Sequence, residues 1–233
     1  MAKVTSKEKE SISFLKVRKV KSPSRAFEFD AGIDFYVPEF TKEFISNLKE
    51  KNPSVFCIKS SGSVYTPGYG IVLANNDPGN LSRIIYDLSD ENDTLIKFDD
   101  ETGENYFILP PHSRIMIPSG IKSRMAQPGR ALIAANKSGV ATKHGLVFGA
   151  QVVDYTYKGE IHLSVINTST KNVRIYENMK IIQFIEMPVF NSEIKIVEDI
   201  QTDIYSSSAA ANLFYAGLLD DRGDGGFGST DKK

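Results

Sequence analysis

Short runs of β-branched and aromatic residues follow one another along most of the chain. Pro, Gly, Asn or Lys-Asn separates most of them, at intervals of roughly 8–15 residues. The clearest runs lie at 12–20, 113–116, 130–135, 145–153, 159–166, 173–176, 181–187 and 193–197. This rhythm predicts an all-β sandwich or barrel rather than strands that alternate with helices.

The segment 39–105 differs from the rest of the chain in composition and in the elements it predicts. A helix is predicted at 41–51, with Thr41 as its N-cap and Phe44, Ile45 and Leu48 on one side. Gly-, Asn- and Asp-rich turns follow, with strand-like runs at 70–74 and 82–88 between them. We interpret 39–105 as an insertion into a β core formed by 1–38 and 106–199. A linker at 200–221, ending in a possible short helix, and a flexible tail at 222–233 complete the predicted organisation.

Composition excludes several classes of function. The 28 basic and 29 acidic residues give a net charge of -1, so direct nucleic-acid binding is not expected. The single Cys57 excludes an intramolecular disulfide framework and a multi-cysteine zinc site. No apolar stretch reaches the length of a membrane span, and the first residues lack the apolar core of a signal peptide. We therefore expect no membrane partner and a cytoplasmic location.

Four fragments carry residues suited to chemistry. The tail RGDGGFGST at 222–230 offers backbone N–H groups, a guanidinium and hydroxyls to a phosphate and one aromatic ring to a flat ring, although a disordered Gly/Ser tail has a similar composition. NKSGVA at 136–141 is either a phosphate cradle or an ordinary turn. VVDYTYKGE at 152–160 places an acid at a hairpin end, where a turn aspartate is also common. AGIDF at 31–35 places an acid in an apolar run, where it could also face solvent.

Taken in order, the fragments resemble the five motifs of the trimeric dUTPase family, the deoxyuridine triphosphate nucleotidohydrolases. AGIDF is similar to the first motif, NKSGVA to the second, and VVDYTYKGE to the third. NMKIIQF at 178–184 is similar to the fourth, and RGDGGFGST to the fifth. The resemblance implies a dUTPase-like β-barrel or jelly roll that assembles as a homotrimer, with each site shared between subunits. The divergent motifs would suit a viral or phage enzyme acting in the host cytoplasm.

The resemblance also implies a role for individual residues. Asp154 would orient the attacking water as the catalytic residue, and Tyr157 would pack on the deoxyribose and exclude a ribose 2'-hydroxyl. Asp34 would hold water in the shell of Mg²⁺, the implied cofactor. The remaining residues would bind the substrate dUTP: on the phosphates Lys137, Ser138, Gly139, Gln183, Arg222, Gly228, Ser229 and Thr230, and on the base Phe227 with the hairpin that holds Phe148, Gly149, Gln151 and Val152.

Several positions depart from the family pattern. Lys137 stands where arginine is usual, which keeps the charge but loses the planar fork. Asn178, Met179 and Lys180 replace Gly, Asp and Arg, so a salt bridge between motifs is expected to be missing or rerouted. Gln151 replaces a glycine beside the base.

Three functions are therefore open. The first is hydrolysis of dUTP to dUMP and pyrophosphate, the second is hydrolysis of dCTP or a modified pyrimidine deoxynucleotide, and the third is a nucleotide-responsive regulatory protein that acts through 39–105.

Overall fold

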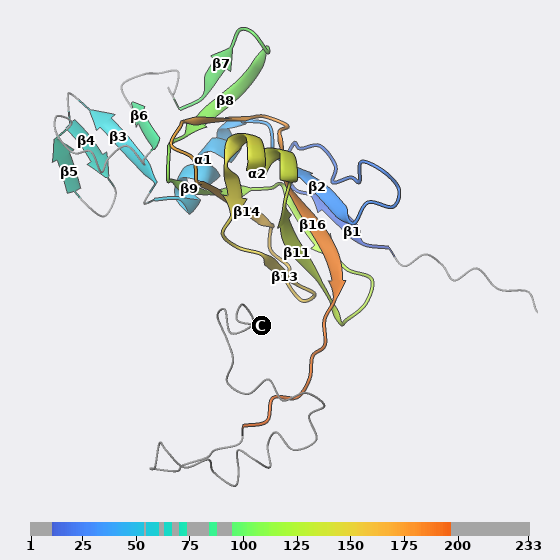
Figure 1. The fold of residues 1–233 in the computed structure, drawn as a ribbon. Helices are drawn as coiled ribbons and strands as arrows, with labels where there is room; N and C mark the ends of the chain where they lie inside the picture. The colour runs from blue at the N-terminus through green and yellow to red at the C-terminus, as the bar shows by residue number, and fades with distance from the viewer. Residues whose placement is uncertain are drawn as a thin grey trace, which may run out of the picture. The chain divides into compact units, whose positions relative to one another are not determined.

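The computed structural model describes residues 11–53, 55–60, 63–66, 70–73, 84–87 and 95–196. The chain divides into two compact units, Met1–Phe190 and Asn191–Lys233. All the helices and strands described below belong to the first unit (Figure 1). None of the described helices is long and apolar enough to cross a membrane.

A four-stranded antiparallel sheet of order β13-β11-β16-β2 holds most of the sequence motifs. Its strands are β2 (Gly32–Tyr36), β11 (Arg130–Asn136), β13 (Val152–Asp154) and β16 (Lys180–Pro188). The register pairs Ala131 with Asp154, Ala135 with Gln183, and Gln183 with Asp34. Motifs far apart in the sequence therefore meet on neighbouring strands.

Three smaller antiparallel sheets complete the β core. The first, of order β12-β14-β9, contains β12 (Leu146–Phe148), β14 (His162–Asn167) and β9 (Arg114–Pro118). The second contains β15 (Val173–Tyr176), β8 (Glu104–Leu109) and β7 (Lys97–Asp99). The third pairs β1 (Ser13–Lys16) with β10 (Ile121–Arg124). The expected all-β architecture is confirmed, although the described strands lie in separate sheets rather than in one continuous closed barrel.

A further four-stranded sheet of order β5-β4-β3-β6 comes from the predicted insertion. It contains β3 (Phe56–Ser60), β4 (Ser63–Thr66), β5 (Gly70–Leu73) and β6 (Ile84–Asp87). β3 to β5 form an antiparallel meander, and β6 pairs with β3 in parallel. The strand-like runs predicted at 70–74 and 82–88 correspond to β5 and β6.

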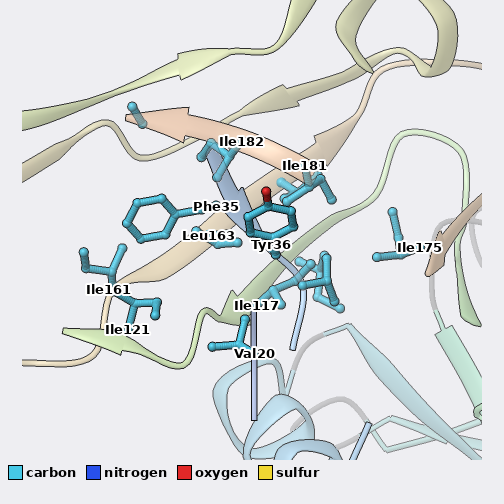
Figure 2. Close-up of a cluster of buried hydrophobic side chains, with 14 of the residues drawn as sticks. Val20, Phe35, Tyr36, Ile117, Ile121, Ile161, Leu163, Ile175, Ile181 and Ile182 are labelled. Carbon is cyan, nitrogen blue, oxygen red and sulfur yellow. The ribbon is translucent and has the colours of Figure 1, made fainter. Parts of the chain in front are cut away.

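The core is a single cluster of buried aliphatic and aromatic side chains (Figure 2). Phe35 of β2 is fully buried, and its ring lies 4.6 Å from that of Phe184 and 5.5 Å from that of Phe14. Each fully buried side chain of this size stabilises the fold by about 1.5–3 kcal/mol through removal of apolar surface from water. Alternate residues of β9 and β14 contribute to the same cluster.

Helix α1 (Lys42–Lys51) confirms the helix predicted in the insertion. The Thr41 hydroxyl accepts a hydrogen bond from the Phe44 amide at 3.2 Å, as an N-cap does. Phe44 and Leu48 are fully buried in the core cluster. At its end, the buried Asn52 side chain donates to the carbonyls of Leu48 and Met116 and accepts from the Met116 amide. The Asn52 carboxamide thus hydrogen-bonds the outer edge of β9 at Met116, as a neighbouring strand would.

Two local predictions differ from the structure. The segment 136–141, expected as a turn or phosphate cradle, lies mostly in the short helix α2 (Ser138–His144), which ends at Gly145 with a φ of 66°. Its seven residues bury no side chain, so no helical periodicity marks them in the sequence. The strand predicted at 193–197 is wrong for the described residues 193–196, where Ile194 and Ile196 are 85% and 79% exposed. No partner strand lies beside them among the described residues.

Candidate functional site

Three of the motifs meet at one end of the central sheet, around Asp34. The β2–β16 and β16–β11 registers place Asp34, Gln183 and Ala135 in one row across three strands. Lys137 follows β11 directly, and its ammonium group binds the Asp34 carboxylate. We call Asp34, Lys137, Lys180 and Gln183 the Asp34 cluster. A cavity of about 270 Å³ lies beside it.

Two lysines share the one buried carboxylate of this cluster. Asp34 is 3% exposed, and the Lys180 ammonium lies 3.2 Å from its second oxygen. The hydrogen bond to Asp34, together with the nearby Tyr36, raises the pKa of Lys180 above its ordinary value. The salt bridge between motifs, expected to be missing or rerouted, is thus formed by Lys180. The two ammonium groups offer N–H donors beside the cavity, which Asp30 also lines.

Gln183 lies over the glycine of the first motif. Its side-chain amide donates to the Asn136 carbonyl at 2.9 Å. A Cβ atom on Gly32 would lie 2.1 Å from the Gln183 Oε1. The side chain therefore occupies the space that only glycine leaves free, which fixes it at the edge of the 270 Å³ cavity.

A second cavity, of about 280 Å³, lies beside β13 and β14. Asp154, Gln151, Val152 and Tyr157 of the third-motif region line it. The Gln151 carbonyl accepts a hydrogen bond from the Ala134 amide at 2.7 Å, so the backbone of this hairpin is anchored to β11. Asp154 is exposed, which leaves its carboxylate accessible from the cavity.

The two cavities touch neighbouring residues of β16, since Phe184 lines the 280 Å³ cavity and Gln183 and Ile185 line the 270 Å³ cavity, but Asp154 and Gln183 lie at different levels of the central sheet. Asp154 pairs with Ala131, and Gln183 pairs with Ala135. Four residues at about 3.3 Å each, and two strand spacings of about 4.8 Å each, separate Asp154 from Gln183 by about 16 Å within one chain. The resemblance assigns Asp154 to the attacking water and Gln183 to the phosphates of the same bound nucleotide. One chain therefore does not bring the two together.

The other expected residues divide between these regions. Ser138 and Gly139 lie in the first turn of α2 next to Lys137, and no described atom lies within 4 Å of where a Gly139 Cβ would be. Phe148 is half-buried against the core, and the Gly149 amide donates to the Ser164 carbonyl at 3.0 Å. The fifth-motif residues lie outside the described residues: Arg222, Phe227, Gly228, Ser229 and Thr230.

Sequence reasoning missed several residues that line the 280 Å³ cavity, among them Met116, His162 and Ser164. The β9–β14 register pairs Met116 with Ser164, while Ile115, Ile117, Leu163 and Val165 face the core. In β14 the alternation of polar His162 and Ser164 with apolar residues was the available signal, because it assigns them to the face opposite the core; Met116 lies between two isoleucines and carries no such signal.

The described residues do not form a complete metal site, but they suit an ion that is also bound by the phosphates of a substrate. Among them there is no group of three His, Cys, Asp or Glu side chains that could hold an ion. Asp34 is the single carboxylate of its cluster, and two ammonium groups already bind it. Because Mg²⁺ is commonly held by one or two carboxylates together with substrate phosphates, the cluster fits an ion that arrives with a phosphate chain.

Comparison with known proteins identifies the family. The sequence pattern of the dUTPase family matches residues 82–210, which include the second, third and fourth motifs. This match spans more than half of the chain. The chain belongs to the dUTPase family. Its members include a deoxyuridine 5'-triphosphate nucleotidohydrolase of Escherichia coli O45:K1, which is 31% identical over 127 residues, or 54% of this chain and 73% of that protein.

Other dUTPases support the same assignment. The enzyme of Paraburkholderia phymatum is 29% identical over 126 residues, which cover 53% of this chain and 74% of that protein. Among solved structures, a dUTPase of Staphylococcus bacteriophage 80alpha with dUpNHpp aligns with a TM-score of 0.53 at 15% identity. That alignment covers 94% of this chain and 98% of the phage chain, so the fold is that of a dUTPase.

Proposed function

We propose that this protein hydrolyses dUTP to dUMP and pyrophosphate. The observation that supports this most is Asp154 and Tyr157 lining one cavity within the segment that matches the dUTPase family. An accessible carboxylate next to a cavity is suited to orient water. A tyrosine ring in the same cavity is suited to pack against a sugar.

In the proposed mechanism Asp154 accepts a hydrogen bond from a water and takes its proton as the water oxygen attacks the α-phosphorus. The bond between the α-phosphorus and the oxygen of the β-phosphate breaks, and pyrophosphate leaves. Lys137 and Gln183 of the Asp34 cluster, with Ser138 and Gly139, bind the phosphates and stabilise the charge that develops. Mg²⁺ bound with the nucleotide, and reached by Asp34 through water, would supply further positive charge.

We further propose that the active site forms between copies of the chain in a homotrimer. Asp154 and Gln183 lie about 16 Å apart in one chain by strand geometry, which is too far for both to contact one phosphate. A neighbouring copy that places its Asp34 cluster opposite the Asp154 hairpin would complete the site. The fifth motif, with Arg222 and Phe227, would then close over the nucleotide.

Gln151 supports a second candidate substrate. Its side chain is exposed, and the residue lines the cavity that holds Asp154 and Tyr157. A carboxamide both donates and accepts hydrogen bonds, so it is able to pair with the 4-amino group of cytosine as well as with the 4-oxygen of uracil. Hydrolysis of dCTP or a modified pyrimidine deoxynucleotide therefore remains the alternative.

A panel of deoxynucleoside triphosphates, with and without Mg²⁺ and with pyrophosphate detection, tests the proposed function. We expect dUTP to be the best substrate and Asp154→Asn to reduce turnover at least about 100-fold while nucleotide still binds. Preferred turnover of dCTP would favour the alternative. Turnover of no pyrimidine deoxynucleotide, or full activity of Asp154→Asn, would reject the proposal.

A further inference from the structure

Tyr157 is held in the cavity by two features of its own loop. Its hydroxyl donates to the Glu160 carbonyl at 2.9 Å, and its amide donates to the Asp154 carbonyl at 3.1 Å. A Cβ atom on Gly159 would lie 2.4 Å from the Tyr157 hydroxyl oxygen and 2.5 Å from Cζ. The ring therefore lies directly over Gly159. Its hydroxyl is positioned by the hydrogen bond to the Glu160 carbonyl.

The Glu160 side chain is fixed by an ion pair with Arg18. Arg18 Nε lies 2.9 Å from Oε1, and Nη2 lies 3.1 Å from Oε2, so the guanidinium binds both carboxylate oxygens. The Gly120 amide also donates to Oε1 at 2.7 Å. The two side chains are only 13% and 14% exposed. A forked, largely buried pair of this kind holds its two backbones in one relative position.

The same carbonyl organises a second residue of the cavity. The Nδ1 of His162 lies 2.8 Å from the Glu160 carbonyl oxygen, and His162 lines the cavity together with Tyr157. The chain thus connects a buried ion pair, through one carbonyl group, to two cavity side chains. Arg18 lies 142 positions from Glu160 in the sequence and outside every motif, so it does not stand out as part of a site.

We propose that Glu160 and Arg18 are positioning residues that set the selection of deoxyribose over ribose. This inference rests on the proposed function, in which the Tyr157 ring leaves no room for a 2'-hydroxyl. Loss of the ion pair allows the Glu160 backbone to move, and the Tyr157 ring moves with it. The space beside the sugar then opens, and a ribonucleotide fits better relative to a deoxyribonucleotide.

The experiment measures the ratio of the dissociation constants for UMP and dUMP, and the ratio of kcat/KM for dUTP and UTP. Glu160→Gln keeps the shape of the side chain and removes its charge, and we expect each ratio to fall about tenfold because a charged hydrogen-bonded pair is lost. Tyr157→Phe removes only the hydroxyl that binds the Glu160 carbonyl, and we expect about a fivefold fall. Arg18→Lys, which keeps the charge without the fork, should lie between Glu160→Gln and the unmodified protein.

Glu43→Gln is the matched control. Glu43 binds the same guanidinium through a single contact at 3.0 Å, but its side chain is 75% exposed, so both ratios should stay within about twofold. Unchanged ratios in Tyr157→Phe and in folded Glu160→Gln would overturn the inference, as would equal binding of UMP and dUMP by the unmodified protein. Selective dUMP binding without any dUTP turnover would reject the proposed function and leave this inference intact.

Discussion

The substitution Gly32→Ala tests whether the position of the Gln183 side chain matters more for activity than for the stability of the fold. The new Cβ would lie 2.1 Å from Oε1 and 2.7 Å from Cδ of Gln183. Contacts this short do not persist, so the Gln183 side chain must rotate away. Both atoms belong to the far end of a flexible side chain, so rotation relieves these two contacts. The Gln183 Cβ would lie 3.3 Å from the new Cβ and does not move on rotation, so the β2 and β16 backbones must shift by a few tenths of an ångström.

The cost to stability should be small. The rotation breaks the 2.9 Å hydrogen bond from Gln183 to the Asn136 carbonyl, a bond between neutral groups worth about 1 kcal/mol. In a domain of this size, that loss lowers the melting temperature by about 2–4 °C.

The cost to activity should be much larger. If Gln183 binds the α-phosphate in the transition state, a hydrogen bond to a charged group worth about 1.5–3 kcal/mol is lost, and kcat/KM for dUTP falls about 10- to 150-fold.

Thermal unfolding and pyrophosphate release measure the two effects on the same samples. Gln183→Ala should lose the same activity as Gly32→Ala, and the double variant should lose no more, because both substitutions remove one interaction. Full activity of Gly32→Ala would refute the reasoning. Losses that multiply in the double variant would also refute it, since Gly32 would then act independently of Gln183.

Two further predictions concern charge and assembly. The raised pKa of Lys180 means that its bond to Asp34 stabilises the fold below the ordinary value of 10.5, and that this contribution is lost as the pH rises through the higher folded value. Urea unfolding should therefore show a steeper loss of stability above pH 10.5 in the unmodified protein than in Lys180→Met; equal losses would contradict the pairing. For the proposed shared site, co-expression of Asp154→Asn chains with Lys137→Ala chains should yield mixed oligomers with activity that neither variant has alone. No recovery in verified mixed oligomers would show that each site lies within one chain.

The strand rhythm was sufficient to predict the fold class, because β-branched runs between turn residues have few other solutions. The α1 prediction also holds, since Thr41 and the apolar face with Phe44 and Leu48 are local signals. The α2 helix was not predictable in this way because it is short, has no fully buried side chain and begins without a capping side chain. Local patterns therefore described the long elements better than the short one beside the phosphate site.

The candidate site depends on strand register, which local patterns do not contain. Lys180 was interpreted as the loss of an arginine, yet the antiparallel pairing of β16 with β2 brings its ammonium to Asp34. Register also separates Asp154 from Gln183 within one chain, and local patterns alone contain no information on this separation. Arg18 belongs to no motif, and only the folded chain brings it to Glu160.

The position of Asn52 has a consequence for how this chain accommodates the segment that follows α1. An unpaired strand edge is a template for association with other chains. At Met116 one carboxamide satisfies both backbone groups of that edge and also ends α1. The start of the chain that follows is therefore fixed next to β9. Lengthening a loop from this point adds only a slowly growing entropic cost. The polypeptide after Asn52 is therefore free to diversify over evolution without opening this edge of β9 to aggregation.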